Sequence, residues 1–168
     1  PGNQDRFPIR IVKKRPHGED AGRRTMRILI ANDKFKGSLA AEKAGIHIKN
    51  SLKAAFPDAV FDLCPIADGG EGTALAMTTA LDGAWGSAPA QDAQGRPVVA
   101  SYGWVPATAT AIMEMSAASG LALVQDISLN PMTASTLGTG ILLRSALDKG
   151  ARRILIGIGG SATNDGGL

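Results

Sequence analysis

Short apolar runs alternate along the chain with polar, glycine-rich segments. Three runs have the length and composition of β-strands: 27–31, 60–64 and 154–158. The last reads Ile-Leu-Ile-Gly-Ile and is typical of a buried parallel strand. Between the first two, a helix is predicted over about 40–56, because apolar residues recur there every three or four positions. These residues are Ala44, Ile48, Leu52 and Ala55. Strand, helix and strand at this spacing predict a βαβ unit.

The pattern changes after Asp82. Segments 84–92 and 97–105 predict a hairpin, and Thr110–Met115 predicts a third strand. Helices are predicted over about 73–81 and 141–148. The fold class is therefore α/β, with a Rossmann-like βαβ first domain followed by the start of a second domain of α+β type. We place these domains at 26–82 and 83–168.

Charge adds one feature, a basic N-terminal segment. The chain carries 18 Lys and Arg against 15 Asp and Glu, a net charge of +3. Residues 1–25 hold seven of the basic and three of the acidic side chains, so the remainder is close to neutral. The body of the chain thus lacks the basic surface of a nucleic-acid-binding protein. Without sustained periodicity, 1–25 is predicted to be a disordered basic extension upstream of a natural start at Met26.

Composition indicates a soluble globular protein, with 44% hydrophobic and 20% charged residues. No apolar run approaches the roughly 18 residues of a membrane span, so no membrane partner is expected. The single cysteine, Cys64, cannot form an internal disulfide. We therefore expect a cytoplasmic protein.

Polar, glycine-containing loops occur at four predicted strand ends or helix starts: 32–38, 67–73, 133–140 and 159–167. Ligands bind at the carboxyl ends of parallel strands, and helix N-termini attract anions. Each loop alone also fits an ordinary turn. Together they predict a site for a phosphorylated ligand and a small polar substrate.

The loop residues suggest specific chemistry. The backbone at Gly159, Gly160, Gly166 and Gly167, with the Ser161 and Thr163 hydroxyls, is suited to cradle phosphates. Asp68, Glu71 and Asp165 are candidate metal ligands or general bases. Glu114 ends an apolar strand, so it is either paired or part of a site.

The same loops carry a family resemblance. The chain resembles the bacterial glycerate kinases of the glycerate 2-kinase type, from Met26 to its last residue. The matching strings include ILIANDKFKGSLAAEK (28–43), PIADGGEGT (65–73), AIMEMSAASGLALV (111–124), NPMTASTLGTG (130–140) and ILIGIGGSATNDGG (154–167). ADGGEGT and GIGGSATNDGG are long and unusual, so the resemblance is specific.

The resemblance implies an enzyme that transfers phosphate from ATP, with Mg²⁺, to D-glycerate, giving 2-phosphoglycerate. It implies a site that includes Asp33, Lys36, Asp68, Glu71, Ser161, Thr163, Asn164 and Asp165. Among these, we assign catalysis to Lys36, Asp68 and Asp165, and metal binding to Asp68 and Asp165. Members of this family are substantially longer, so we read the chain as an N-terminal fragment that is inactive alone.

Two other functions fit parts of the pattern. Gly157-x-Gly159-x-x-Ala162 after a strand matches a variant of the dinucleotide fingerprint, which would indicate an oxidoreductase. A non-catalytic protein that binds small anions could use the same loops. No Walker-type P-loop string is present.

Overall fold

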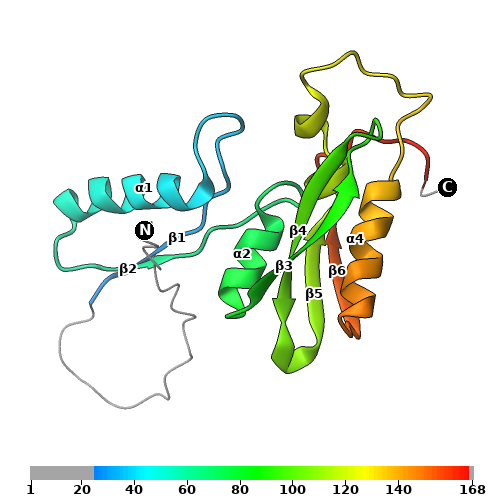
Figure 1. Ribbon diagram of the computed structural model, residues 1–168. Coiled ribbons are helices and arrows are strands. Elements are labelled where there is room, and N and C mark those ends of the chain that lie inside the picture. Colours follow the sequence, from blue (N-terminus) through cyan, green and yellow to red (C-terminus); the bar gives the residue numbers. More distant parts are fainter. Residues whose placement is uncertain (1–24, 167–168) are drawn as a thin grey trace, which may run out of the picture. The chain divides into compact units, whose positions relative to one another are not determined.

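The computed structural model describes residues 25–166, which form parts of two compact units (Figure 1). The first unit ends at Ile66 and the second begins at Ala67. The domain boundary predicted from the sequence lies farther along the chain, between residues 82 and 83. The predicted N-terminal extension lies outside the described residues, apart from Thr25.

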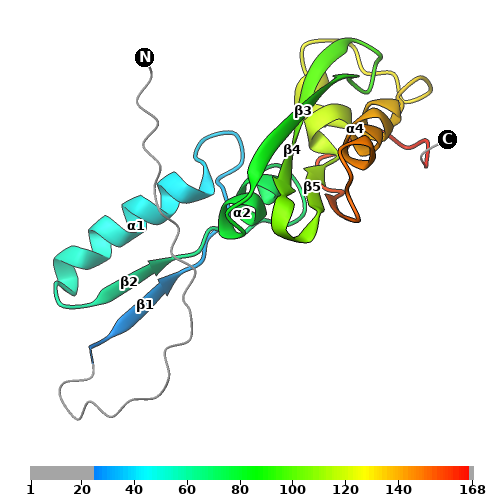
Figure 2. The same cartoon turned by 60° about the horizontal axis from the view of Figure 1, so that its bottom comes forward.

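The first unit is a strand–helix–strand arrangement. β1 (Arg27–Ile30) and β2 (Val60–Leu63) pair in parallel, with Arg27 opposite Val60, and α1 (Ala41–Ala55) connects them. Figure 2 shows α1 running along the strand pair. The predicted βαβ unit is therefore confirmed.

The predicted buried face of α1 is only partly correct. Ala44 is buried, but Ile48 is 37% exposed and Ala55 is also exposed. Gly45 is buried instead, where a Cβ would lie 3.0 Å from the Asn32 side-chain oxygen. Two strands of four residues offer too little surface to cover a helix of 15 residues.

The second unit contains a four-stranded sheet in the order β3-β4-β5-β6. Its strands are β3 (Ala84–Gln91), β4 (Pro97–Val105), β5 (Thr110–Glu114) and β6 (Arg153–Gly157). The β3–β4 and β4–β5 pairs are antiparallel and the β5–β6 pair is parallel, which confirms the predicted hairpin. Its helices are α2 (Thr73–Ala80), α3 (Ser116–Ser119) and α4 (Leu137–Asp148), with short 3₁₀ turns at Pro106–Thr108 and Leu121–Val124.

Helices cover both faces of this sheet. Leu142 and Ala146 of α4 pack with Met113 on one face. Ala74 of α2 packs with Ile112 on the other. Helices on both faces of a mixed sheet are a three-layer α/β arrangement, so the α/β class is confirmed.

Glycine allows the closest helix–sheet contacts. A Cβ on Gly103 of β4 would lie 1.7 Å from the Thr78 hydroxyl oxygen of α2. A Cβ on Gly138 of α4 would lie 1.9 Å from the carbonyl oxygen of Gln91 in β3. Both helices therefore rest directly on strand backbone.

β6 is parallel, as predicted, but it is not buried. It is the last strand in the order and pairs only with β5 among the described strands. Leu155 is 36% and Ile156 is 40% exposed, while Ile154 packs against the core. The apolar run predicted burial wrongly because it reports composition, not position at the edge of a sheet.

Candidate functional site

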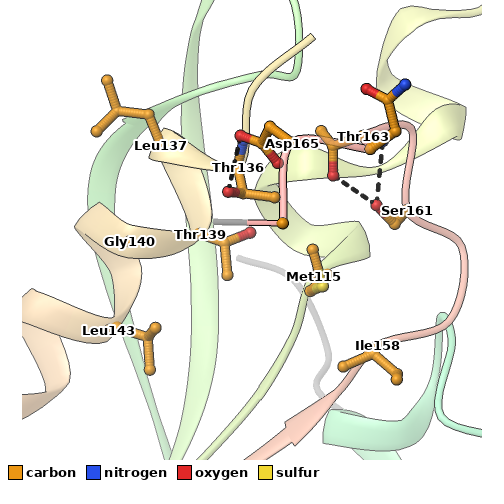
Figure 3. Close-up of a pocket in the computed structure, with 12 residues that line it drawn as sticks. Met115, Thr136, Leu137, Thr139, Gly140, Leu143, Ile158, Ser161, Thr163 and Asp165 are labelled. Atoms are coloured by element: carbon orange, nitrogen blue, oxygen red, sulfur yellow. Dashed lines mark hydrogen bonds between the residues drawn. The ribbon is translucent and has the colours of Figure 1, made fainter. Parts of the chain in front are cut away.

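A pocket of about 770 Å³ lies in the second unit, where the start of α4 faces the segment after β6 (Figure 3). One part of its wall is apolar, formed by Met115, Leu137, Leu143 and Ile158. The other part carries hydroxyl, amide and carboxyl groups, from Thr136, Thr139, Ser161, Thr163, Asn164 and Asp165, with Gly140 and Gly166 completing the lining.

Asp165 caps the N-terminus of α4. Its Oδ2 accepts hydrogen bonds from the backbone N–H of Thr136 at 2.7 Å and from the Thr136 hydroxyl at 3.0 Å. Thr136 is the N-cap residue, and the carboxylate therefore meets the positive end of the helix dipole. The helix begins at Leu137, four residues before the predicted start, and its capping carboxylate lies 29 residues farther along the chain.

Ser161 and Thr163 form a hydroxyl pair in the pocket wall. Their side-chain oxygens are 2.8 Å apart, and the Thr163 N–H also donates to the Ser161 hydroxyl at 3.1 Å (Figure 3). The loop is tethered from behind by the Ala162 N–H, which donates to the Ser119 carbonyl at 2.8 Å. The two hydroxyls are thus held side by side on a fixed backbone.

The glycines at the end of β6 and directly after it serve close packing as well as loop geometry. The Gly159 N–H donates to the Gly69 carbonyl at 2.9 Å. A Cβ on Gly157 would lie 2.4 Å from that carbonyl oxygen, and a Cβ on Gly159 would lie 2.7 Å from the Gly70 nitrogen. The 67–73 loop and the end of β6 therefore touch backbone to backbone.

Two of the other glycines that were predicted to cradle phosphates have a left-handed backbone conformation. Gly160 and Gly166 have φ of +73° and +63°, a conformation that favours glycine. Gly166 lines the pocket. Gly167 lies outside the described residues.

The 67–73 loop is closed by its own side chains. Asp68 Oδ1 accepts the Gly70 N–H at 3.1 Å. The Thr73 hydroxyl donates to the Gly70 carbonyl at 2.7 Å and accepts the Gly69 N–H at 3.1 Å. Asp68 and Glu71 are not among the residues that line the pocket, so their membership in a shared site stays a prediction.

The remaining predicted residues, Asp33 and Lys36, belong to the first unit. Asp33 Oδ1 accepts the Lys34 N–H at 2.6 Å. Asn32 stabilises the same loop by donating its side-chain amide to the Ala41 carbonyl at 2.8 Å. The role of Asp33 and Lys36 in a site with the second unit stays a prediction.

The described residues offer few ligands for Mg²⁺. Within residues 25–166, no three His, Cys, Asp or Glu side chains gather as a metal site. Mg²⁺ at kinase sites is usually held by one or two carboxylates, with substrate phosphates and water as the other ligands. Asp165, the carboxylate in the pocket lining, fits that limited role.

Of the predicted site residues, Ser161, Thr163, Asn164, Asp165 and Gly166 line the pocket, whereas the prediction named no individual residue on its α4 side. Thr136, Leu137 and Thr139 line it. The signal was present, because the hydroxyl-rich entry at 133–140 was noted as an anion-attracting helix start. Met115 and Ile158 had no such signal, since apolar residues beside strands usually belong to a core.

The fold is α/β, and the pocket lies beyond the carboxyl ends of the parallel strands β5 and β6, where proteins of this class usually bind ligands. The Glycerate kinase family profile matches residues 28–168, and the chain belongs to this family. The resemblance read from the loop motifs is therefore confirmed. No helix among residues 25–166 is long and apolar enough to cross a membrane.

Individual relatives support the family membership. The chain is 47% identical to a glycerate kinase of Bacillus subtilis and 46% identical to a glycerate 2-kinase of Escherichia coli, covering 84% of this chain in each case. A crystal structure of a Salmonella typhimurium LT2 protein assigned as glycerate kinase 2 matches with a TM-score of 0.72 and 43% identity, over 86% of this chain and 39% of that one. The chain spans about 37% of the length of the two curated relatives.

Proposed function

We propose that the protein containing this chain phosphorylates glycerate, with ATP as donor and 2-phosphoglycerate as product. The observation that carries the proposal is family membership over residues 28–168. The hydroxyl-lined pocket at the α4 N-terminus supports it, because such a surface suits phosphate groups. A cytoplasmic location, and an absence of nucleic-acid or membrane partners, are part of the same proposal.

The reaction requires positioning and neutralisation of charge more than covalent chemistry. A hydroxyl oxygen of glycerate attacks the γ-phosphorus of ATP, forming one P–O bond while the bond to the β-phosphate oxygen breaks and ADP leaves. The proton of the attacking hydroxyl passes to a carboxylate, for which Asp165 and Asp68 are the candidates. Ser161 and Thr163 would hydrogen-bond phosphate oxygens, and Lys36 would offset negative charge or hold the glycerate carboxylate.

Mg²⁺, when bound, would neutralise phosphate charge, and Asp165 is the residue of the pocket that would hold it. Asp165 also caps α4 through Thr136. We infer that this cap keeps the carboxylate at the pocket wall and stabilises the first turn of the helix that forms the opposite side.

The first experiment measures ADP release by the gene product extended to its natural stop codon, with ATP, Mg²⁺ and D-glycerate. The 168-residue chain is assayed in parallel. Turnover is expected in the extended protein only, and ³¹P NMR of the product distinguishes phosphorylation at the two hydroxyls. An extended protein that binds glycerate without turnover would favour the anion-binding alternative.

Two variants test the carboxylate assignment. Asp165→Asn keeps an oxygen that can accept the Thr136 N–H, so α4 remains capped while the charge is lost. We expect kcat to fall about 10²–10⁴-fold in Asp165→Asn or Asp68→Asn, whichever removes the base. Asp148→Asn is the matched control, because Asp148 is exposed and, within residues 25–166, its ion-pair partner is Arg144 on the surface of α4. If neither Asp68→Asn nor Asp165→Asn slows turnover, the assignment is wrong.

The oxidoreductase alternative gains no support from the loop after β6. A dinucleotide fingerprint opens a helix directly after its glycines, whereas residues 158–166 form no helix. Gly157 and Gly159 meet the backbone of Gly69 and Gly70. NAD(H) binding by the extended protein, without ATP-dependent turnover, would reverse this conclusion.

A further inference from the structure

Glu114 is a buried carboxylate at the last position of β5. Glu114 is 8% exposed. Oε1 accepts the Ala74 N–H at 2.6 Å, and Oε2 accepts the Ser116 hydroxyl at 3.0 Å. Within residues 25–166 Glu114 forms no ion pair. Its burial is therefore compensated by two hydrogen bonds and by the positive end of α2, where Ala74 lies in the first turn.

The position of Glu114 links two loops that are distant in sequence. Its partner Ala74 is 40 residues away and directly follows the 67–73 loop. In the β5–β6 register Glu114 lies opposite Gly157, the residue whose backbone approaches the Gly69 carbonyl. The side chain thus holds the start of α2, while the backbone of the same strand holds the end of β6.

We propose that Glu114 is a positioning residue, which holds the Asp68–Thr73 loop at the carboxyl ends of β5 and β6 in the geometry that phosphoryl transfer requires. The proposal rests on the proposed function. Both carboxylate oxygens already accept hydrogen bonds from structural groups, so the role acts through the loop and not through contact with the reacting atoms. A displacement of about 1 Å in a catalytic loop can cost about 10²-fold in rate.

The test uses the full-length gene product and compares Glu114→Ala with Glu114→Gln. Alanine removes the acceptor of the Ala74 N–H, and we expect kcat to fall about 10²-fold while KM for glycerate changes less than about threefold. Glutamine keeps an acceptor oxygen for Ala74 and offers an amide N–H to the Ser116 hydroxyl. It should retain kcat within about fivefold of wild type.

Asp92→Ala is the matched control. Asp92 is 1% exposed and likewise accepts backbone N–H groups, from Gln94 and Arg96, but it lies in the β3–β4 turn. The control should lose thermal stability, as Glu114→Ala does, yet keep kcat within about threefold below its melting temperature. This separates positioning from general destabilisation.

Hydrogen–deuterium exchange gives a readout that does not depend on activity. Amides of residues 68–76 should lose protection in Glu114→Ala but keep it in Glu114→Gln and Asp92→Ala. If Glu114→Ala does not fold, Glu114→Asp replaces it, because the shorter side chain cannot reach the Ala74 N–H.

Three outcomes would overturn the proposal. They are a kcat within about threefold of wild type in the Glu114→Ala protein, unchanged loop protection, or a Glu114→Gln protein as slow as Glu114→Ala, which would show that the charge itself acts. If wild type does not phosphorylate glycerate at all, the proposed function fails separately, and exchange still decides whether Glu114 holds the loop.

Discussion

The two units of the chain bury very different amounts of apolar side chain. Ile30 and Ala44 are the buried apolar residues of the described part of the first unit, whereas the second has two core clusters on opposite faces of its sheet. Few apolar side chains are therefore available to hold β1, β2 and α1 together. The difference teaches that the core of the second unit can hold a pocket in fixed geometry. Asp33 and Lys36, in contrast, belong to a unit with few buried apolar residues.

The strongest test of this difference removes one apolar side chain from each unit. Met113→Ala deletes a fully buried side chain between the sheet and α4, and should cost the second unit about 2–5 kcal/mol. Both tryptophans, Trp85 and Trp104, lie in the β3–β4 hairpin, so urea unfolding followed by fluorescence reports on this unit. Leu29→Ala, 65% exposed in β1, should change protection of β1 and β2 by less than about 0.5 kcal/mol. An equal loss in both variants would contradict the comparison.

A pair of glycine substitutions gives the next largest effect. Gly103→Ala forces a methyl group against the Thr78 hydroxyl and should cost about 1–3 kcal/mol, because β4 and α2 must separate. Gly37→Ala in the first unit meets no atom within 4 Å, and only its φ of +75° opposes the change, at about 1 kcal/mol. Differential scanning calorimetry ranks the two. A harmless Gly103→Ala would mean that α2 does not rest on the strand as described.

Acid should destabilise the second unit through Asp92, and this effect should be smaller than that of the substitutions above. Burial raises the pKa of Asp92, but the side-chain and backbone hydrogen bonds from Arg96, the Gln94 N–H and the Arg96 charge outweigh it, so the pKa lies below its usual 3.8. A lowered folded-state pKa stabilises the fold above pH 3.8, and this stabilisation is lost as the pH falls through the folded value. The melting temperature of the second unit should therefore decline below about pH 4, and Asp92→Asn should flatten that decline.

Arg96 and Arg27 provide the matched charge comparison. Arg96 pairs with Asp92 at 2.6 Å and Asp126 at 2.7 Å, which raises its own pKa and lowers that of Asp126. Arg27 also pairs at 2.6 Å, with Asp62, but its side chain is 56% exposed. Arg27→Ala should cost at most about 1 kcal/mol, and Arg96→Ala more, since it leaves Asp92 buried without its cation. Equal costs would argue against a special role for burial.

Most of the fold could be predicted from the sequence, because its helices and strands have a regular spacing of apolar residues. The strands, the hairpin and the longer helices follow from apolar spacing and turn residues. Ser116–Ser119 was missed, since a four-residue helix of Ser and Ala has no measurable period. The exposure of β6 was missed because sheet order depends on pairing partners that one segment cannot reveal.

The candidate site could be predicted only where a local sequence pattern contains it. The loop after β6 could be predicted as a candidate site because glycine, hydroxyl and carboxyl residues follow one another there in the sequence. The Asp165 cap on Thr136 and the Glu114 contact with Ala74 join residues 29 and 40 positions apart, so no local pattern contains them. The family resemblance supports the proposed function, and the contacts supply hypotheses about which residues hold the site in place.

The contact between the Gly69–Gly70 backbone and the Gly157–Gly159 backbone has a consequence for how this protein can change. At Gly157 and Gly159 any Cβ would overlap main-chain atoms of the facing loop, which cannot turn aside as a flexible side chain can. A saturation library should therefore return glycine alone at these two positions, while neighbouring Ile158, 71% exposed, accepts many residues. Directed evolution of a new ligand preference should therefore keep Gly157 and Gly159 and vary the apolar side of the pocket, which includes Ile158.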